Sequence, residues 1–308
     1  MGTSRWSTDD WQGYSASTST KSTAQIFTSN DLHADLDPKG TNRESRDSDE
    51  NPESTAIIVG CDVTGSMGFI AENLIRTGLG VLFEEIYDRK PVTDPHIMVS
   101  AIGDVDSDRV PLQVGQFEAD LSITEDLEKV YVEGNGGGNN KESYDLPYYY
   151  AAYHTSIDCF EKRNKKGYIF TIGDELPPSF TDKNAVKNII GDDGLEANIP
   201  FKDTILAASK MYNTYHIVIA EGWFAEHNGA EYVQNAWKEY LSENVIILSD
   251  YTKLAEGIGC IMEVNEGRSV DAVAGSWSGD TSVVVKSAID GLVAKTDDDG
   301  GDNDVMRF

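Results

Sequence analysis

The feature that most constrains this chain is an apolar run that ends in an acidic, hydroxyl-rich turn. Residues 55–61 read T-A-I-I-V-G-C, the turn D-V-T-G-S follows at 62–66, and a helical pattern begins at residue 69. Such a run is typical of a strand buried on both faces of a parallel sheet. Open α/β sheets bind their ligands at the carboxyl ends of their strands. The sequence therefore predicts an oxygen-rich loop at that edge of a sheet.

Strand-like and helix-like segments alternate along the centre of the chain. Strands are predicted at 55–61, 97–103, 168–173, 215–220 and 244–249, and a short piece at 110–117 contains a proline that suits a sheet edge. Helical periodicity is found at 69–88, 122–130, 143–161, 202–212, 229–240, 251–262 and 281–294. This alternation predicts a doubly wound, mostly parallel α/β sheet with helices on both faces and one short edge strand.

The two ends of the chain differ from the centre. Residues 1–54 are polar with scattered aromatic residues, and we expect an arm whose aromatic side chains dock on the central domain, which spans 55–265. Residues 266–295 are predicted to be a C-terminal extension with a helix. Residues 296–308 include three consecutive aspartates and are predicted to be an acidic, disordered tail.

The charge balance excludes several classes of partner. Lys and Arg total 25 and Asp and Glu total 53, which gives a formal net charge of −28. Such a chain repels nucleic acid and anionic membrane surfaces, and it attracts cations and basic protein surfaces. The three cysteines form no C-x-x-C pair, and no apolar run reaches the ~18 residues of a membrane span. We therefore expect a cytoplasmic protein with reduced thiols.

Three predicted loops carry oxygen donors near strand ends or helix starts. They are D-V-T-G-S at 62–66, G-N-G-G-G-N-N-K-E-S at 134–143 and G-D-E-L-P-P at 173–178. Carboxylate, amide and hydroxyl oxygens are the ligands of hard divalent cations such as Mg²⁺. Two simpler interpretations remain open, since Ser66 suits a helix N-cap and residues 134–138 suit a flexible loop.

Together these loops resemble the metal-ion-dependent adhesion site of the von Willebrand factor A (vWA) family. The family pattern is D-x-S/T-x-S, then Thr or Asp in a Gly-rich loop, then Asp after a buried strand. The second loop is similar to the G-G-G-D/N-x-x-E form of vWA proteins related to the alpha-kinase group and of bacterial intracellular variants. The resemblance covers roughly residues 55–265.

The resemblance implies a ligand set for Mg²⁺, or for Mn²⁺ or Ca²⁺ in its place. Hydroxyls of Thr64 and Ser66 would bind the ion, and Asp62 and Asp174 would bind it directly or through water. Asn139 would take the position usually held by Thr. Two further acids are secondary candidates, Glu142 and Asp104.

The function that the resemblance implies is recognition without turnover. A partner protein would supply an Asp or Glu to the ion, and intracellular vWA proteins often act as adaptors for a separate AAA+ ATPase. The alternative is a Mg²⁺-dependent phosphatase or phosphotransferase similar to the haloacid dehalogenases. That chemistry uses D-x-D, and Thr64 stands where the second acid would be. We therefore expect an interaction module and no enzyme.

Overall fold

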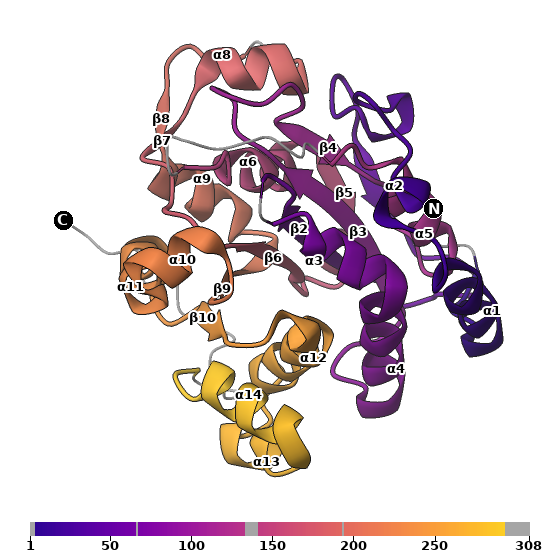
Figure 1. Ribbon diagram of the computed structural model, residues 1–308. Helices are drawn as coiled ribbons and strands as arrows, with labels where there is room; N and C mark the ends of the chain where they lie inside the picture. The colour runs from indigo at the N-terminus through magenta and orange to yellow at the C-terminus, as the bar shows by residue number, and fades with distance from the viewer. Residues whose placement is uncertain (1–3, 66, 133–140, 193, 293–308) are drawn as a thin grey trace.

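A six-stranded sheet forms the centre of the computed structural model, which describes residues 4–65, 67–132, 141–192 and 194–292 (Figure 1). The strand order is β10-β9-β6-β2-β3-β4, and all pairs are parallel except β3 with β4. The strands are β2 (Thr55–Asp62), β3 (Pro95–Ile102), β4 (Leu112–Val114), β6 (Gly167–Gly173), β9 (Tyr212–Ile219) and β10 (Val245–Leu248). The predicted short edge strand is found as β4, which is shorter than the expected 110–117 and begins directly after Pro111.

The central strands are buried along their whole length, as their apolar composition predicts. Every residue of β2 and β3 is buried. Val59 on β2 lies between Val99 on β3 and Phe170 on β6, so apolar side chains stack across the sheet. This arrangement holds the carboxyl end of β2 in the middle of the sheet.

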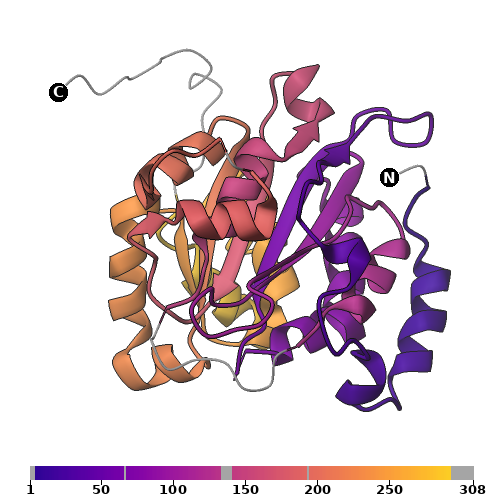
Figure 2. The same cartoon turned by 90° about the horizontal axis from the view of Figure 1, so that it is seen from above.

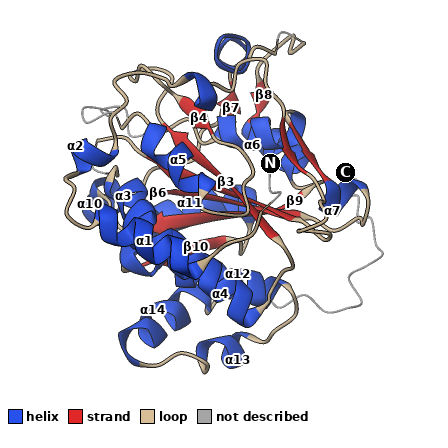
Figure 3. Ribbon diagram, turned by 90° about the vertical axis from the view of Figure 1, so that its right-hand side faces the viewer, coloured by secondary structure: helices blue, strands red, loops and turns tan. Residues whose placement is uncertain are grey.

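Helices cover both faces of this sheet, as Figures 2 and 3 show from two directions. The core on one face includes residues of helices α4, α5, α12 and α14, and the core on the other face includes residues of α6, α9 and α11. The first group comprises α3 (Phe69–Asn73), the π-helical turn η2 (Leu74–Gly78), α4 (Leu79–Arg89), α5 (Ser122–Lys129), η4 (Tyr251–Lys253), α12 (Leu254–Asn265), α13 (Val270–Ala274) and α14 (Gly279–Ile289). The second comprises α6 (Asp145–Tyr153), α9 (Phe201–Ala208), α10 (Trp223–Asn228) and α11 (Ala230–Leu241). The doubly wound α/β class is confirmed.

The N-terminal segment packs on the sheet domain through its aromatic residues. It contains α1 (Thr8–Thr18), α2 (Thr23–Ile26), η1 (Ala34–Leu36) and β1 (Arg43–Ser45). Trp6 stacks on Phe83 of α4 with ring centroids 4.2 Å apart. Trp11 approaches α4 at Gly80, where an added Cβ would lie 1.9 Å from the indole nitrogen. The contact through aromatic residues was predicted, whereas helix α1 was not.

The predicted helix over 143–161 is interrupted. Helix α6 ends at Tyr153, and β5 (Thr155–Ile157) then pairs in parallel with β1 of the N-terminal segment before α7 (Asp158–Glu161). The β-branched Thr155 and Ile157 favour this pairing. A second small sheet joins β7 (Phe180–Thr181) to β8 (Ile199–Pro200), with α8 (Lys183–Ala185) and η3 (Val186–Ile190) between them.

The three cysteines are buried free thiols. Among the described residues no helix is long and apolar enough to cross a membrane. The predicted domain boundaries stay predictions, and the predicted tail at 296–308 lies outside the described residues.

Candidate metal centre

Two of the predicted loops meet where the strand order of the sheet reverses. The chain continues from β2 to β3 on one side, and β6 lies beside β2 on the other. Asp62 is the last residue of β2, and Asp174 directly follows Gly173, the last residue of β6. Doubly wound sheets bind ligands in the crevice outside this reversal point. Asp62 and Asp174 therefore lie at the position where the fold places a site.

Asp62 is fully buried, and three donor groups lie within hydrogen-bond distance of its carboxylate. Its Oδ1 accepts from the Thr64 N–H at 2.9 Å and lies 2.7 Å from the Thr64 hydroxyl. Its Oδ2 accepts from the Tyr144 hydroxyl at 3.2 Å. Gly65 has a φ of +34°, a conformation that favours glycine, and so allows the chain to turn directly after Thr64.

A second carboxylate shares the Thr64 hydroxyl. Glu142 Oε1 lies 3.1 Å from Thr64 Oγ1, while Glu142 Oε2 is buried with no hydrogen-bond partner among the described residues. The hydroxyl has one proton, so it donates to only one of its two carboxylate neighbours. A bridge between Lys141 and Leu176 places this loop beside the loop after β6.

Asp174 is held by the start of helix α10. Its Oδ2 accepts from the Phe224 N–H at 2.6 Å. The close approach needs glycine at position 222, because an added Cβ there would lie 2.3 Å from Asp174 Cβ. The neighbouring Glu175 also turns inward, and its Oε2 is buried without a partner among the described residues.

Burial raises the pKa of all four carboxylates in this group. Desolvation raises the pKa of Asp62 and of Glu142. The charge of Asp174 adds to the shift at Asp62, and the charge of Asp62 adds to the shift at Glu142. Desolvation raises the pKa of Glu175 to about 8 and also raises the pKa of Asp174. Among the described residues, no Lys, Arg or His forms an ion pair with any of the four. A bound cation would supply the missing positive charge.

These residues fit a divalent ion of the hard, oxygen-binding class. Asp62 and Thr64 offer a carboxylate and a hydroxyl side by side, and Asp174 and Glu142 offer further oxygens nearby. The part of the chain that the structure describes contains no cluster of three or more His, Cys, Asp or Glu that could hold a metal by themselves. Of the predicted set, Ser66 and Asn139 lie outside the described residues.

Asp104 accepts hydrogen bonds within the turn that follows β3. It follows β3 and is 2% exposed, and its carboxylate accepts from the Asp106 N–H at 3.2 Å and from the Ser107 hydroxyl at 2.7 Å. These contacts shape the turn at 104–108. Its role as a secondary metal ligand remains a prediction.

Three residues at the centre were not predicted from the sequence. Glu175 is a fourth acid of this group, and the Tyr144 hydroxyl donates a hydrogen bond to Asp62. Gly222 leaves the space that the Asp174 side chain occupies. One signal was present in the sequence, the G-D-E run at 173–175. An added Cβ at Gly173 would lie 1.9 Å from the Tyr144 hydroxyl oxygen, so this glycine is what allows the tyrosine to reach Asp62.

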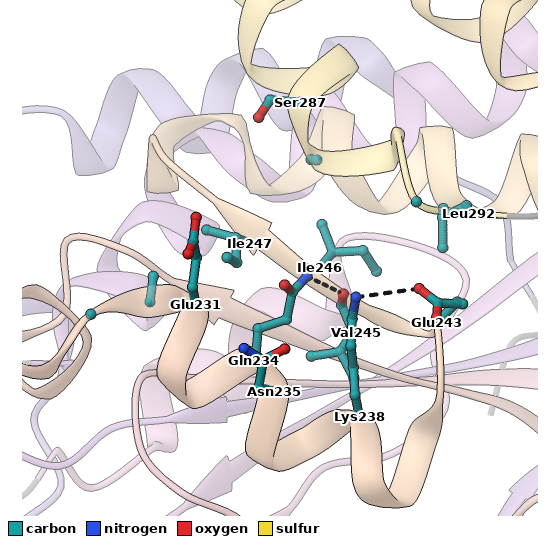
Figure 4. Close-up of a pocket in the computed structure, with 14 residues that line it drawn as sticks. Glu231, Gln234, Asn235, Lys238, Glu243, Val245, Ile246, Ile247, Ser287 and Leu292 are labelled. Carbon is teal, nitrogen blue, oxygen red and sulfur yellow. Dashed lines mark hydrogen bonds and ion pairs between the residues drawn. The ribbon is translucent and has the colours of Figure 1, made fainter.

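A pocket of about 690 Å³ lies elsewhere, between α11, β10 and α14 (Figure 4). Its polar groups pair with one another, since Gln234 donates to the Val245 carbonyl at 2.8 Å and Lys238 lies 3.3 Å from Glu243. It lies at the β10 edge of the sheet, remote from the reversal point at β2 and β6. We assign it no role in the metal centre.

Comparison with known proteins gives similarity of fold at low identity. No family model and no curated protein match the sequence. The open form of the pilus adhesin SpaC from Lactobacillus rhamnosus GG has a TM-score of 0.47 and 10% identity, covering 74% of this chain and 31% of the adhesin. Proximal thread matrix protein 1 from the mussel byssus has a TM-score of 0.41 and 9% identity, covering 68% and 47%.

A third similar structure is von Willebrand factor type A from Catenulispora acidiphila. It has a TM-score of 0.38 and 14% identity, covering 70% of this chain and 44% of that protein. The chain spans less than half the length of all three structures. Such similarities concern the fold alone, and the fold class rests on this chain's own strand order and helix layers.

Proposed function

We propose that this chain is a metal-dependent protein-interaction module that holds Mg²⁺ at the carboxyl ends of β2 and β6. The ligands would be Asp62, Thr64 and Asp174, together with the two predicted residues that lie outside the described part. The observation that carries the proposal is a group of buried carboxylates around the Thr64 hydroxyl that lacks a paired positive charge. A divalent cation satisfies both the charge and the unpartnered oxygens.

A simple capping turn is the competing interpretation, and the chain contains a suitable comparison. Asp250 and Thr252 repeat the same contacts, with Asp250 Oδ1 2.9 Å from the Thr252 N–H and 2.6 Å from its hydroxyl. Asp250 and Thr252 are not buried, and Asp250 is the N-cap of the short helix η4. Asp62 differs because it is fully buried and lies close to other acids. The local turn is therefore shared, and the buried charge around it is what favours a cation.

The chemistry of the ligand set favours binding over catalysis. With Asp62 and Asp174 bound through water, the groups that touch the ion directly are neutral hydroxyl and amide oxygens, and an open coordination position can take a carboxylate from a partner protein. The net charge of −28 opposes a strongly acidic partner, but screening limits this repulsion to about 8 Å at physiological salt. The partner is thus proposed to present one Asp or Glu among neutral or basic residues, and a separate AAA+ ATPase is one such class.

Metal titration tests the proposal. We expect calorimetry to detect one Mg²⁺ or Mn²⁺ site in chelator-stripped wild type and to detect none in Thr64→Val, a substitution that removes the hydroxyl and keeps the shape. Thr252→Val is the matched control, because it breaks the same local contact at the exposed turn. Equal metal binding by Thr64→Val and wild type would refute the proposed ligand set.

A phosphatase assay addresses the alternative function. Hydrolysis of p-nitrophenyl phosphate that requires Mg²⁺ and is lost in Asp62→Asn would favour the phosphotransferase. We expect no such activity, because Thr64 replaces the second acid that this chemistry uses.

A further inference from the structure

A basic pocket of about 370 Å³ lies at the amino ends of the central strands. Its lining includes the first residue of β2, so it is at the opposite edge of the sheet from the candidate metal centre. Three lysines line it, Lys90, Lys165 and Lys166. The acidic residue of the lining, Glu266, accepts a hydrogen bond from the Tyr168 hydroxyl. The pocket thus has a surplus of positive charge in a chain whose net charge is −28.

The positive charges of this pocket are not neutralised by the described part of the chain. Two of its lysines belong to the run K-R-N-K-K at 162–166. The first two cations of this run pair with Asp47 at 3.2 and 2.7 Å. The last two line the pocket and form no ion pair with a described residue, and Lys90 forms none either. The Lys166 ammonium donates to the neutral Ser209 carbonyl at 2.7 Å. The pocket therefore suits an anionic occupant.

The sequence that follows the last described residue, Leu292, is rich in anionic groups. Residues 293–308 contain five aspartates against one lysine and one arginine, and four of these aspartates lie between 297 and 302. The charge of this segment is thus opposite to that of the pocket.

The described chain ends near the edge of the sheet where this pocket lies. A Cβ added at Gly291 would lie 3.8 Å from the carboxylate of Glu243, just before β10. Asn244 donates to the Thr214 carbonyl at 3.0 Å, and Thr214 directly follows a residue that lines the pocket. Neighbouring strands are ~4.8 Å apart and an extended chain covers ~3.3 Å per residue, so residues 293–297 can span ~17 Å, or about three strand spacings. The aspartates can therefore reach from β10 to the pocket at β9, β6 and β2.

We propose that the acidic segment 297–302 of this chain binds in the basic pocket, with its carboxylates paired with Lys90, Lys165 and Lys166. Each exposed ion pair is weak, but several act together here, and the short connection to Leu292 gives the segment a high effective concentration. The bound segment would cover the amino ends of the strands and leave the metal edge open to a partner. The proposal is independent of the proposed function, and it replaces the disordered tail that composition alone predicts.

Carbodiimide cross-linking of the full chain tests the proposal, because this reagent joins a carboxylate to an amine where the two are in contact. We expect mass spectrometry of the monomer fraction to find amide bonds between residues 297–302 and the lysines of the pocket. Lys187 on η3 is an exposed lysine without an ion pair among the described residues, and it serves as the internal comparison. Its cross-links to the same segment should be at least about fivefold fewer. Raising the salt to 0.5 M should lower the yield at the pocket, because salt screens ion pairs.

Trace acetylation provides a second measurement that does not depend on the cross-link. The triple variant Asp297→Asn/Asp298→Asn/Asp299→Asn removes three of the acids and alters no described residue. Lys165 should be acetylated at least about threefold faster in this variant than in wild type, because its ammonium group is no longer paired. Lys187 should react at the same rate in both proteins.

A charge-matched variant separates pairing from the general effect of net charge. It removes three acids from exposed positions of α9, α10 and α11, as Asp203→Asn/Glu226→Gln/Glu231→Gln. Lys165 should react in this variant as it does in wild type. The proposal would be overturned by equal cross-linking of Lys187 and the pocket lysines, or by cross-links confined to a dimer fraction, which would make a second copy the occupant. Equal acetylation of Lys165 in wild type and in the tail variant would also overturn it.

Discussion

His96 should make the stability of this protein fall sharply in mild acid. It lies on β3 and is 1% exposed, with Nδ1 3.2 Å from the Ser45 hydroxyl of the N-terminal segment and Nε2 buried without a partner among the described residues. Burial lowers the pKa of His96 to about 4, although the nearby charges of Asp94, Asp47 and Asp158 partly oppose this shift. The folded protein therefore holds a neutral imidazole at pH values where an unfolded chain binds a proton.

The size of the effect follows from the two pKa values. The stability that His96 contributes is full above pH 6.5, the ordinary histidine value, and is lost as the pH falls towards 4. One pKa unit corresponds to about 1.4 kcal/mol, so lowering the pH from 7 to 5 should remove about 2 kcal/mol of unfolding free energy through this residue.

Urea denaturation of wild type and His96→Gln at pH 7 and pH 5 tests this prediction. Buried carboxylates also titrate in this range, but both proteins share them, so the difference between the two pH dependences isolates His96. We expect wild type to lose about 2 kcal/mol more than the variant. His227→Gln, at an exposed histidine, serves as control and should behave as wild type. Equal pH dependence in wild type and His96→Gln would contradict the reasoning.

Three further predictions concern packing and the metal. Trp11→Ala should lower the unfolding free energy by about 3–5 kcal/mol in urea titrations, because the buried indole fills the notch at Gly80; a loss below about 1 kcal/mol would show that α1 does not pack as described. Gly222→Ala should weaken Mg²⁺ binding about tenfold in calorimetry, because the added Cβ displaces Asp174. Gly257→Ala on α12 is the control and should leave Mg²⁺ binding unchanged, because a Cβ added there would lie 3.6 Å from the nearest atom. Equal effects of the two substitutions would contradict the prediction. EDTA should lower the melting temperature and leave the far-ultraviolet dichroism intact, since the apolar sheet folds without the ion; loss of the dichroism would refute this.

The sheet could be predicted because the apolar pattern of each buried strand is present in the strand's own residues. The run at 55–61 is apolar on both faces, and only a fully buried strand accommodates it. Helix α1 was not predictable, because its main apolar contact, Trp11, depends on a glycine that lies some seventy residues further along the chain. The break after Tyr153 likewise depends on β1, which supplies the pairing partner of β5.

The candidate metal centre likewise contains residues that could be predicted from the sequence and residues that could not. Strand-end residues such as Asp62 and Asp174 could be placed from the sequence, because parallel strands bring their carboxyl ends to one edge. The contribution of Tyr144 could not, because it depends on the space above Gly173, and that of Glu175 depends on the direction of the chain after β6. Side-chain direction in loops is set by such tertiary contacts.

The most direct test of the account is a crystal structure grown with Mn²⁺ and measured for anomalous scattering. We expect an anomalous peak that places Mn²⁺ within bonding distance of Thr64 Oγ1 and close to the carboxylates of Asp62 and Asp174, at the ends of β2 and β6. The same crystals of Thr64→Val should lack the peak, and those of Thr252→Val should keep it. A peak that appears only at another acidic cluster, or none at saturating Mn²⁺, would contradict the metal centre.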